Sequence, residues 1–189
     1  MLGGLDTLVF DIQDIGARFY TYIATLGGCM EVAAERGLKV VVLDRPNPLG
    51  GRRFDGPIQD ADLIGKFTAF RAMPVTHGMT VGEIARLFNT EIGCDLEVVS
   101  MLGWRRDLFF DETGLPWVNP SPNMRSLTEE LLYPMIALLE ANPAISVGRG
   151  TDRPFEHVGA PWMDAEALVG NLRARGLGGV WPMRTTFVP

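Results

Sequence analysis

Two short apolar segments, each ending in an aspartate, constrain the fold of this chain most strongly. Residues 5–11 (LDTLVFD) and residues 38–44 (LKVVVLD) have the composition of buried parallel strands. Between them, the apolar positions of residues 20–36 recur at helical spacing, and Gly37 is typical of the residue after a helix end. A strand, a helix and a second strand in this order predict a right-handed crossover in a parallel sheet. We therefore expect an α/β fold with a Rossmann-like parallel sheet flanked by helices.

The rest of the chain extends this pattern. We expect further strands at residues 67–71, 96–101 and 144–147, and further helices at residues 80–89, 126–140 and 164–175. Thr80 and Ser126 are each followed three residues later by a glutamate, which predicts a capping box at the start of each helix. A Gly-Ala-Pro-Trp loop near residue 160 predicts a boundary between a Rossmann-like domain over residues 1–158 and the start of a smaller C-terminal α/β subdomain over residues 159–189.

Composition argues against nucleic acids and membranes as partners. Of the 189 residues, 47% are hydrophobic and 21% are charged, which suits a globular protein with a sizeable core. The formal net charge is −6 and no run of Lys or Arg provides a basic nucleic-acid footprint. No apolar stretch is long enough to span a bilayer, and the first residues lack the regions of a signal peptide. Cys29 and Cys94 are far from both histidines, which predicts buried free thiols and no metal site.

Polar residues cluster directly after the first predicted strand, in the motif DIQDIGARFYTY. Functional groups in open α/β sheets lie beyond the carboxyl ends of strands, so Asp11 and Asp44 are expected at the same edge. The motif supplies carboxylates, an amide, a guanidinium and two phenols, from Asp11, Gln13, Asp14, Arg18, Tyr20 and Tyr22. One interpretation is a polar cradle for a hydroxyl-rich or charged ligand, and the other is a structural Asp–Arg pair that caps the helix.

The second predicted strand is followed by a stiff loop, LDRPNPLGG. Its prolines restrict the backbone and hold Asp44, Arg45 and Asn47 in place. This indicates either a preorganised site or a rigid turn whose aspartate binds backbone amides. His77 lies just before a predicted helix N-terminus, where it either binds a ligand or transfers a proton, or is a hydrogen-bonded structural residue.

The later motifs supply further candidates. NPSPN, at residues 119–123, is a second stiff polar loop, but no base is placed near its serine. In SVGRGTDRPFEH, Arg149 can hold a carboxylate with a bidentate fork. Glu156 follows an aromatic residue, and an apolar wall raises the pKa of a carboxyl towards that of a general acid. Glu140, at the end of the preceding helix, is a second candidate for the acid.

Taken in order, DIQDIGARFYTY, LDRPNPLGG, VTHGMTVGEIA, NPSPN and SVGRGTDRPFE resemble the NamZ family of exo-β-N-acetylmuramidases. The resemblance covers about residues 5–162. It implies a Rossmann-like domain joined to a smaller C-terminal domain, and hydrolysis of β-linked N-acetylmuramic acid from the non-reducing end of peptidoglycan fragments. It also implies a periplasmic or extracellular location and no organic cofactor.

The same resemblance implies that a further N-terminal section, with a Gly-Pro-Glu-His-Gly-like loop, precedes this chain and that the C-terminal domain is cut short. The glutamate of that loop is a prime candidate for one of the two carboxylates of a glycosidase. A Glu-Gly-Thr-Asn segment of the family reads Glu-Ala-Asn-Pro here, at residues 140–143.

Together the motifs and the resemblance define the candidate site. The candidate catalytic residues are Glu156, Glu140, His77 and Asp14. The candidate substrate-binding residues are Asp11, Gln13, Arg18, Tyr20, Tyr22, Asp44, Arg45, Asn47, Asn123, Arg149 and Thr151. Two other functions stay open, a non-catalytic module that binds a cell-wall sugar and a hydrolase of another acidic glycan. A nucleotide-binding domain would need a phosphate-binding loop, and neither G-x-G-x-x-G after a strand nor a P-loop lysine motif is present.

Overall fold

The computed structural model describes residues 3–188, which form two compact units, one that ends at Pro120 and one that begins at Ser121. The first unit contains β1 (Thr7–Phe10), α1 (Tyr22–Arg36), β2 (Lys39–Leu43), η1 (Ala61–Leu63), α2 (Val81–Ile92), β3 (Asp95–Val99) and η2 (Phe110–Thr113). The second contains α3 (Leu127–Ile136), η3 (Ala137–Ala141) and α4 (Ala165–Ala174). None of the described helices is both long and apolar enough to cross a membrane.

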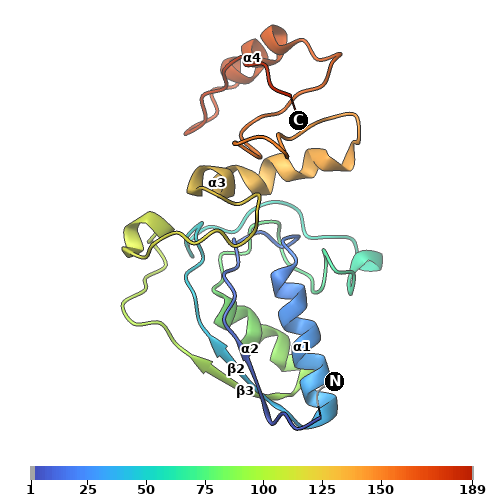
Figure 1. Cartoon of the computed structure of the whole chain (residues 1–189), viewed down its shortest axis with the longest axis vertical. Helices are drawn as coiled ribbons and strands as arrows, with labels where there is room; N and C mark the ends of the chain where they lie inside the picture. Colours follow the sequence, from blue (N-terminus) through green and yellow to red (C-terminus); the bar gives the residue numbers. More distant parts are fainter. Residues whose placement is uncertain (1–2, 189) are drawn as a thin grey trace. The chain divides into compact units, whose positions relative to one another are not determined.

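The sheet of the first unit is parallel throughout, as the sequence predicts. Its strand order is β1-β2-β3, with Leu8 opposite Val40 and Val42 opposite Val98. Helix α1 connects β1 to β2 and α2 lies between β2 and β3 in the chain, so each pair of strands is joined by a helical crossover (Figure 1). The α/β fold class is therefore confirmed, and the three carboxyl ends meet at one edge of the sheet.

Local sequence signals place the two helices of this unit. Gly37 adopts the left-handed conformation (φ 66°) that ends α1, and its N–H donates to the carbonyl of Ala33. Thr80 and Glu83 form the predicted reciprocal capping box at the start of α2. Both helix ends therefore satisfy backbone groups that would otherwise lack partners.

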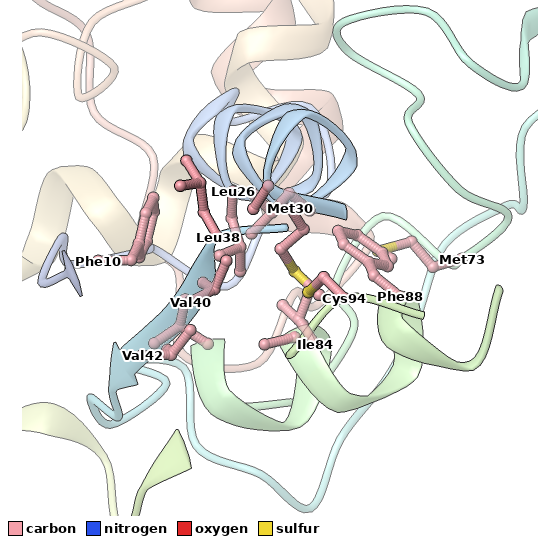
Figure 2. Packing of buried hydrophobic residues seen from close by; sticks show 14 residues of the cluster. Phe10, Leu26, Met30, Leu38, Val40, Val42, Met73, Ile84, Phe88 and Cys94 are labelled. Atoms are coloured by element: carbon pink, nitrogen blue, oxygen red, sulfur yellow. The ribbon is translucent and has the colours of Figure 1, made fainter. Parts of the chain in front are cut away.

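The core of the first unit lies between the sheet and the two helices (Figure 2). Val40 and Val42 alternate with half-buried residues along β2 and point into this core. The buried apolar cluster consists of Phe10, Ile23, Leu26, Met30, Ala33, Leu38, Val40, Val42, Met73, Val81, Ile84, Ala85, Phe88 and Cys94. Each large side chain that is fully buried here contributes about 1.5–3 kcal/mol.

Close packing between α1 and Phe70 depends on a glycine. A Cβ atom at Gly27 would lie 2.1 Å from Cε1 of Phe70, whereas one at the neighbouring Gly28 would meet nothing within 4 Å. Phe70 in turn packs against Phe88 of α2, with ring centroids 5.1 Å apart. The small residue at position 27 therefore lets a loop aromatic reach the core.

The second unit has its own capped helices. Ser126 and Glu129 form the predicted capping box at the start of α3, and the chain passes into the 3-10 helix η3 after Ile136. Asp164 caps α4 by accepting hydrogen bonds from the N–H groups of Glu166 and Ala167. The two predicted capping residues, Thr80 and Ser126, are thus confirmed, and Asp164, the first residue of the last predicted helix, is a third cap.

Two predicted strands are wrong. Within residues 67–71, Ala69 forms one bridge, with the nearby Lys66. The N–H of Ala69 donates to the carbonyl of Lys66, and the carbonyl of Ala69 accepts from the N–H of Gly65, so neither group pairs with a neighbouring strand. Residues 144–147 contribute one bridge, in which Ser146 exchanges both backbone hydrogen bonds with Gly159. The N–H of Ala144 donates instead to Oδ1 of Asn142 at 3.0 Å, so it is not available to a neighbouring strand.

The boundary between the two units lies closer to the N-terminus than the predicted domain boundary. The predicted boundary at residues 158 and 159 lies inside the second unit, which begins at Ser121. Compactness alone does not define a folding domain, so the boundary remains a prediction.

Candidate active site

The first candidate residues lie at the carboxyl edge of the parallel sheet. Asp11 follows β1 and Asp44 follows β2, as predicted. Asp11 is exposed and its Oδ1 lies 2.6 Å from Nη2 of Arg45, which also donates through Nε at 2.8 Å. This ion pair therefore links the two strand ends. It is open to solvent, since 38% of the Arg45 side chain and 48% of the Asp11 side chain are exposed.

Asp14 and His77 form a buried pair. Oδ2 of Asp14 accepts a hydrogen bond from the N–H of Gly16 at 2.8 Å and lies 3.2 Å from Nε2 of His77. The N–H of Met79 donates to Nδ1 of His77, so the proton of a neutral imidazole is on Nε2, the atom that faces the aspartate. The other oxygen of Asp14, Oδ1, is buried and has no hydrogen-bond partner within residues 3–188.

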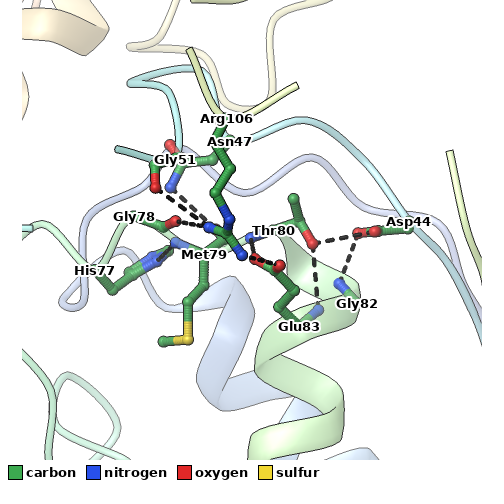
Figure 3. Close-up of polar contacts among 10 residues, drawn as sticks. All are labelled: Asp44, Asn47, Gly51, His77, Gly78, Met79, Thr80, Gly82, Glu83 and Arg106. Atoms are coloured by element: carbon green, nitrogen blue, oxygen red, sulfur yellow. Dashed lines mark hydrogen bonds and ion pairs between the residues drawn. The ribbon is translucent and has the colours of Figure 1, made fainter. Parts of the chain in front are cut away.

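Asp44 binds the start of α2 (Figure 3). Its Oδ1 accepts from the N–H of Gly82 at 2.7 Å, and its Oδ2 accepts from Oγ1 of Thr80 at 3.0 Å. A carboxylate at a helix N-terminus satisfies orphan N–H groups and interacts favourably with the helix dipole. The position requires a glycine, because a Cβ at residue 82 would lie 2.7 Å from the carboxyl carbon of Asp44.

Asn47 and Gln13 tie neighbouring loops together. The Asn47 amide donates to the carbonyl of Met79 at 3.0 Å and accepts from the N–H of Leu49 at 2.9 Å. The Gln13 amide donates to the carbonyl of Pro46 at 2.9 Å. For these two residues and for Asp44, the structure places the side chain in internal hydrogen bonds, which matches the rigid-turn interpretation. A contact with substrate stays a prediction for all three.

Arg106 was not predicted, although it is central to this network (Figure 3). Its Nη1 donates to the carbonyls of Gly51 and Gly78, both at 3.2 Å, and its Nη2 forms an ion pair with Glu83. The guanidinium also lies 5.7 Å from the ring centroid of Trp104. No local pattern identifies this residue, because all of its polar partners are more than twenty positions away in the chain.

Arg18 and the two tyrosines lie where the chain enters α1. Burial lowers the pKa of the Arg18 guanidinium, and its Nε has no hydrogen-bond partner in the described part of the chain. The rings of Tyr20 and Tyr22 meet edge to face, with centroids 4.7 Å apart. The Tyr22 hydroxyl donates to the carbonyl of Pro120 at 2.5 Å.

In the second unit, Arg149 faces an internal carboxylate. Its Nε bonds to Oε1 of Glu140, and its Nη2 donates to Oε2 of the same residue at 3.0 Å. The guanidinium also lies over the ring of Phe155, 4.8 Å from its centroid. Both predicted roles, acid for Glu140 and carboxylate binder for Arg149, therefore involve residues that are bound to each other in this structure.

The remaining candidates of the second unit differ in how they are held. Oγ1 of Thr151 donates to the carbonyl of Gly148 at 2.7 Å, so it helps to close the loop around Arg149. Glu156 is half-buried, and its carboxylate makes no hydrogen bond or ion pair within residues 3–188. Asn123 is also half-buried.

The candidate residues are thus divided into two groups, one in each unit. The group in the first unit comprises Asp11, Gln13, Asp14, Arg18, Tyr20, Tyr22, Asp44, Arg45, Asn47 and His77. The group in the second comprises Asn123, Glu140, Arg149, Thr151 and Glu156. Over the described residues, no group of three or more His, Cys, Asp or Glu side chains is placed to hold a metal ion.

Carboxylates, amides and an imidazole thus lie at the carboxyl edge of a parallel sheet, the edge at which open α/β folds bind their ligands. Comparison with known proteins then identifies the family. The family described as exo-β-N-acetylmuramidase NamZ, N-terminal, matches residues 1–128, and its C-terminal counterpart matches residues 131–189. The chain belongs to this family.

Individual relatives agree with this assignment. The chain is 47% identical, over 191 aligned residues and its whole length, to the peptidoglycan β-N-acetylmuramidase NamZ of Bacillus subtilis (strain 168). Two crystal structures of DUF1343 family proteins from Bacteroides fragilis NCTC 9343 are each 39% identical. Their TM-scores are 0.89, over 95% of this chain and 47% of the other, and 0.74, over 82% and 44%. This chain therefore spans about half the length of the relatives that it matches, including 46% of the Bacillus protein.

Proposed function

We propose that this chain forms part of a glycoside hydrolase that releases N-acetylmuramic acid from the non-reducing end of peptidoglycan fragments. The observation that carries the proposal is the match to both parts of the NamZ family, over residues 1–128 and 131–189. The relative named peptidoglycan β-N-acetylmuramidase, which is 47% identical over the whole chain, supports the same activity and the same glycan.

Glycoside hydrolysis commonly uses two carboxyl groups, an acid for the leaving oxygen and a base or nucleophile on the opposite side. A catalytic carboxyl must have an oxygen that is not already held by the protein. Among the candidates, Asp14 keeps a buried oxygen without a partner, and Glu156 keeps its whole carboxylate available. Glu140 is a weaker candidate, because both of its oxygens are bound to Arg149.

Recognition of the sugar needs a cation as well as neutral hydroxyl partners. N-acetylmuramic acid differs from N-acetylglucosamine by a lactyl ether that ends in a carboxylate. A guanidinium binds such a group through two parallel hydrogen bonds. Arg18 and Arg149 are the candidates for this role, one in each unit.

The activity is tested by digesting peptidoglycan fragments that end in N-acetylmuramic acid and measuring the free sugar by mass spectrometry. The assay is run with this chain and with a longer polypeptide that also carries the upstream section expected from the family resemblance. Release of N-acetylmuramic acid from the non-reducing end only is the expected result. Internal cleavage products without the free sugar contradict the exo-acting proposal.

A non-catalytic sugar-binding module is the second candidate. It is favoured by the Glu140–Arg149 pair, in which both oxygens of one candidate acid are bound by the protein. An enzyme shows a bell-shaped dependence of kcat/KM on pH, whereas a binding module retains the fragments without releasing sugar.

We also propose a periplasmic or extracellular location, which cell fractionation of the native protein tests.

A further inference from the structure

The Glu140–Arg149 pair has the geometry with which an arginine receives a free carboxylate. Both oxygens of Glu140 face the guanidinium, one at Nε and one at Nη2. This two-point arrangement is the strongest and most specific way in which arginine binds a carboxylate ligand. Glu140 thus occupies the position that an incoming carboxylate would need.

The guanidinium is held on a rigid platform. It lies 4.8 Å from the ring centroid of Phe155, which is fully buried and meets the Tyr133 ring edge to face at 4.8 Å. Stacking on an aromatic face fixes the plane of a guanidinium and leaves its N–H edge directed outward. The platform therefore orients Arg149 independently of Glu140.

The backbone of this platform is unusual. Among the described residues, Phe155 is the one non-glycine residue with a positive φ, 62°, a conformation that costs free energy for a side chain of this size. Its N–H donates to the carbonyl of Val147 at 2.7 Å, which closes the loop that carries Arg149. Thr151 closes the same loop through its hydroxyl and its N–H, both donated to Gly148. Three hydrogen bonds and a buried ring thus hold Arg149 in this position.

Glu140, in contrast, is held only weakly in its position. It lies near the end of the 3-10 helix η3, and 31% of its side chain and 47% of the Arg149 side chain are exposed. Ion pairs that water reaches stabilise a protein only weakly. A carboxylate that brings further contacts of its own can therefore replace Glu140 at small cost.

We propose that Arg149 is the residue that selects acidic sugars, and that Glu140 is an internal carboxylate which the lactyl carboxylate of the substrate displaces. This inference rests on the proposed function and reassigns Glu140 from catalytic acid to competitor. The pair would then favour acidic sugars over neutral ones. A neutral sugar has no carboxylate to replace that of Glu140, whereas an acidic sugar binds the same two N–H groups of Arg149.

The test measures the Kd of N-acetylmuramic acid and of N-acetylglucosamine by titration calorimetry, for the unaltered chain and for three variants. Glu140→Gln removes the competing charge and keeps the size of the side chain. It is expected to bind N-acetylmuramic acid about two- to fivefold more tightly, the range set by the strength of an exposed ion pair, with no change for N-acetylglucosamine. Arg149→Lys keeps the charge but not the fork, and is expected to lose most of the preference for the acidic sugar.

Glu91→Gln is the matched control. Glu91 pairs with Arg71 at 2.9 Å, and Arg71 lies 4.3 Å from the ring centroid of Phe70, so this second site repeats the chemistry of the first. The control should leave both Kd values unchanged, and circular dichroism verifies the fold of every variant.

The outcomes separate this inference from the proposed function. Equal or weaker binding of N-acetylmuramic acid by Glu140→Gln overturns the displacement of Glu140, and an unchanged preference in Arg149→Lys overturns the role of Arg149. In both cases a preference of the unaltered chain for the acidic sugar would leave the proposed function intact. If the unaltered chain binds neither sugar, or both equally, the inference and the proposed recognition of muramic acid fail together.

Discussion

Nε2 of His77 lies 3.2 Å from Oδ2 of Asp14, and the structure leaves none of the His77 side chain and 6% of the Asp14 side chain exposed. This contact joins the segment between β1 and α1 to the loop that precedes α2. Since the N–H of Gly16 also donates to Asp14, the pair fixes two segments at the carboxyl edge of the sheet.

Removal of Asp14 should destabilise the protein strongly. Asp14→Ala removes the acceptor of the Gly16 N–H and the carboxylate that faces the buried His77 imidazole, and is expected to lower the free energy of unfolding by about 2–4 kcal/mol. Asp11→Ala, which breaks the exposed pair with Arg45, should cost less than about 1 kcal/mol. Urea denaturation of both variants provides the measurement. Similar losses in the two would show that the buried pair is not a structural link.

Adjacent glycines of α1 should respond in opposite directions to alanine. Gly27→Ala places a Cβ against the Phe70 ring and is expected to destabilise the protein by about 1–3 kcal/mol. Gly28→Ala meets nothing within 4 Å and should stabilise the helix by up to about 1 kcal/mol. Thermal unfolding of both variants tests the packing of Phe70 against α1. If Gly27→Ala leaves the unfolding temperature unchanged, the Phe70 ring does not pack against residue 27 as described.

The two thiols should differ in reactivity. Burial raises the pKa of the Cys94 thiol, and this side chain is in the core, so little thiolate forms near neutral pH. Cys29 is only partly buried and borders a surface groove that Leu8 and Phe67 also line. Alkylation with iodoacetamide at pH 8, followed by mass spectrometry, should modify Cys29 first. Cys94 should react only as fast as the core opens, and equal rates would contradict the packing described.

One surface pair should make stability depend on alkaline pH. Lys39 lies 2.6 Å from Glu97, and the hydrogen bond and charge of Glu97 raise the pKa of Lys39 above its ordinary value of 10.5. A raised lysine pKa contributes stability that is fully present below the unfolded-state value and is lost as pH rises through the folded-state value. The small difference in unfolding free energy between the unaltered chain and Lys39→Met should therefore disappear at pH values above the pKa of Lys39 in the folded protein. High salt should reduce it at any pH, and a difference that grows with pH would be inconsistent with the pair.

The fold was predictable because its signals are local. The runs of apolar residues in β1 and β2, the glycine after α1 and the capping boxes at Thr80 and Ser126 each specify structure within a few residues. The two wrong strands, at residues 67–71 and 144–147, are short apolar runs whose backbone groups bond nearby instead of to a neighbouring strand. Whether such a run pairs depends on a distant partner, which a single sequence does not show.

The site was predictable in position but not in detail. The strand ends placed Asp11 and Asp44 correctly, since the carboxyl ends of parallel strands share one edge. The contact of Asp44 with Gly82 and the hydrogen bonds of Arg106 join segments far apart in the chain, so no local pattern reveals them. For the same reason the sequence presented Glu140 and Arg149 as separate candidates and not as partners.

The most direct test of the proposed hydrolase compares two chromogenic substrates, the β-glycosides of N-acetylmuramic acid and of N-acetylglucosamine. The assay uses this chain and a longer polypeptide that contains it together with the upstream family section. One guanidinium–carboxylate contact predicts a kcat/KM about ten- to hundredfold higher for the muramic acid glycoside. Equal rates for the two glycosides, or no release by either polypeptide when both are folded, would contradict the account.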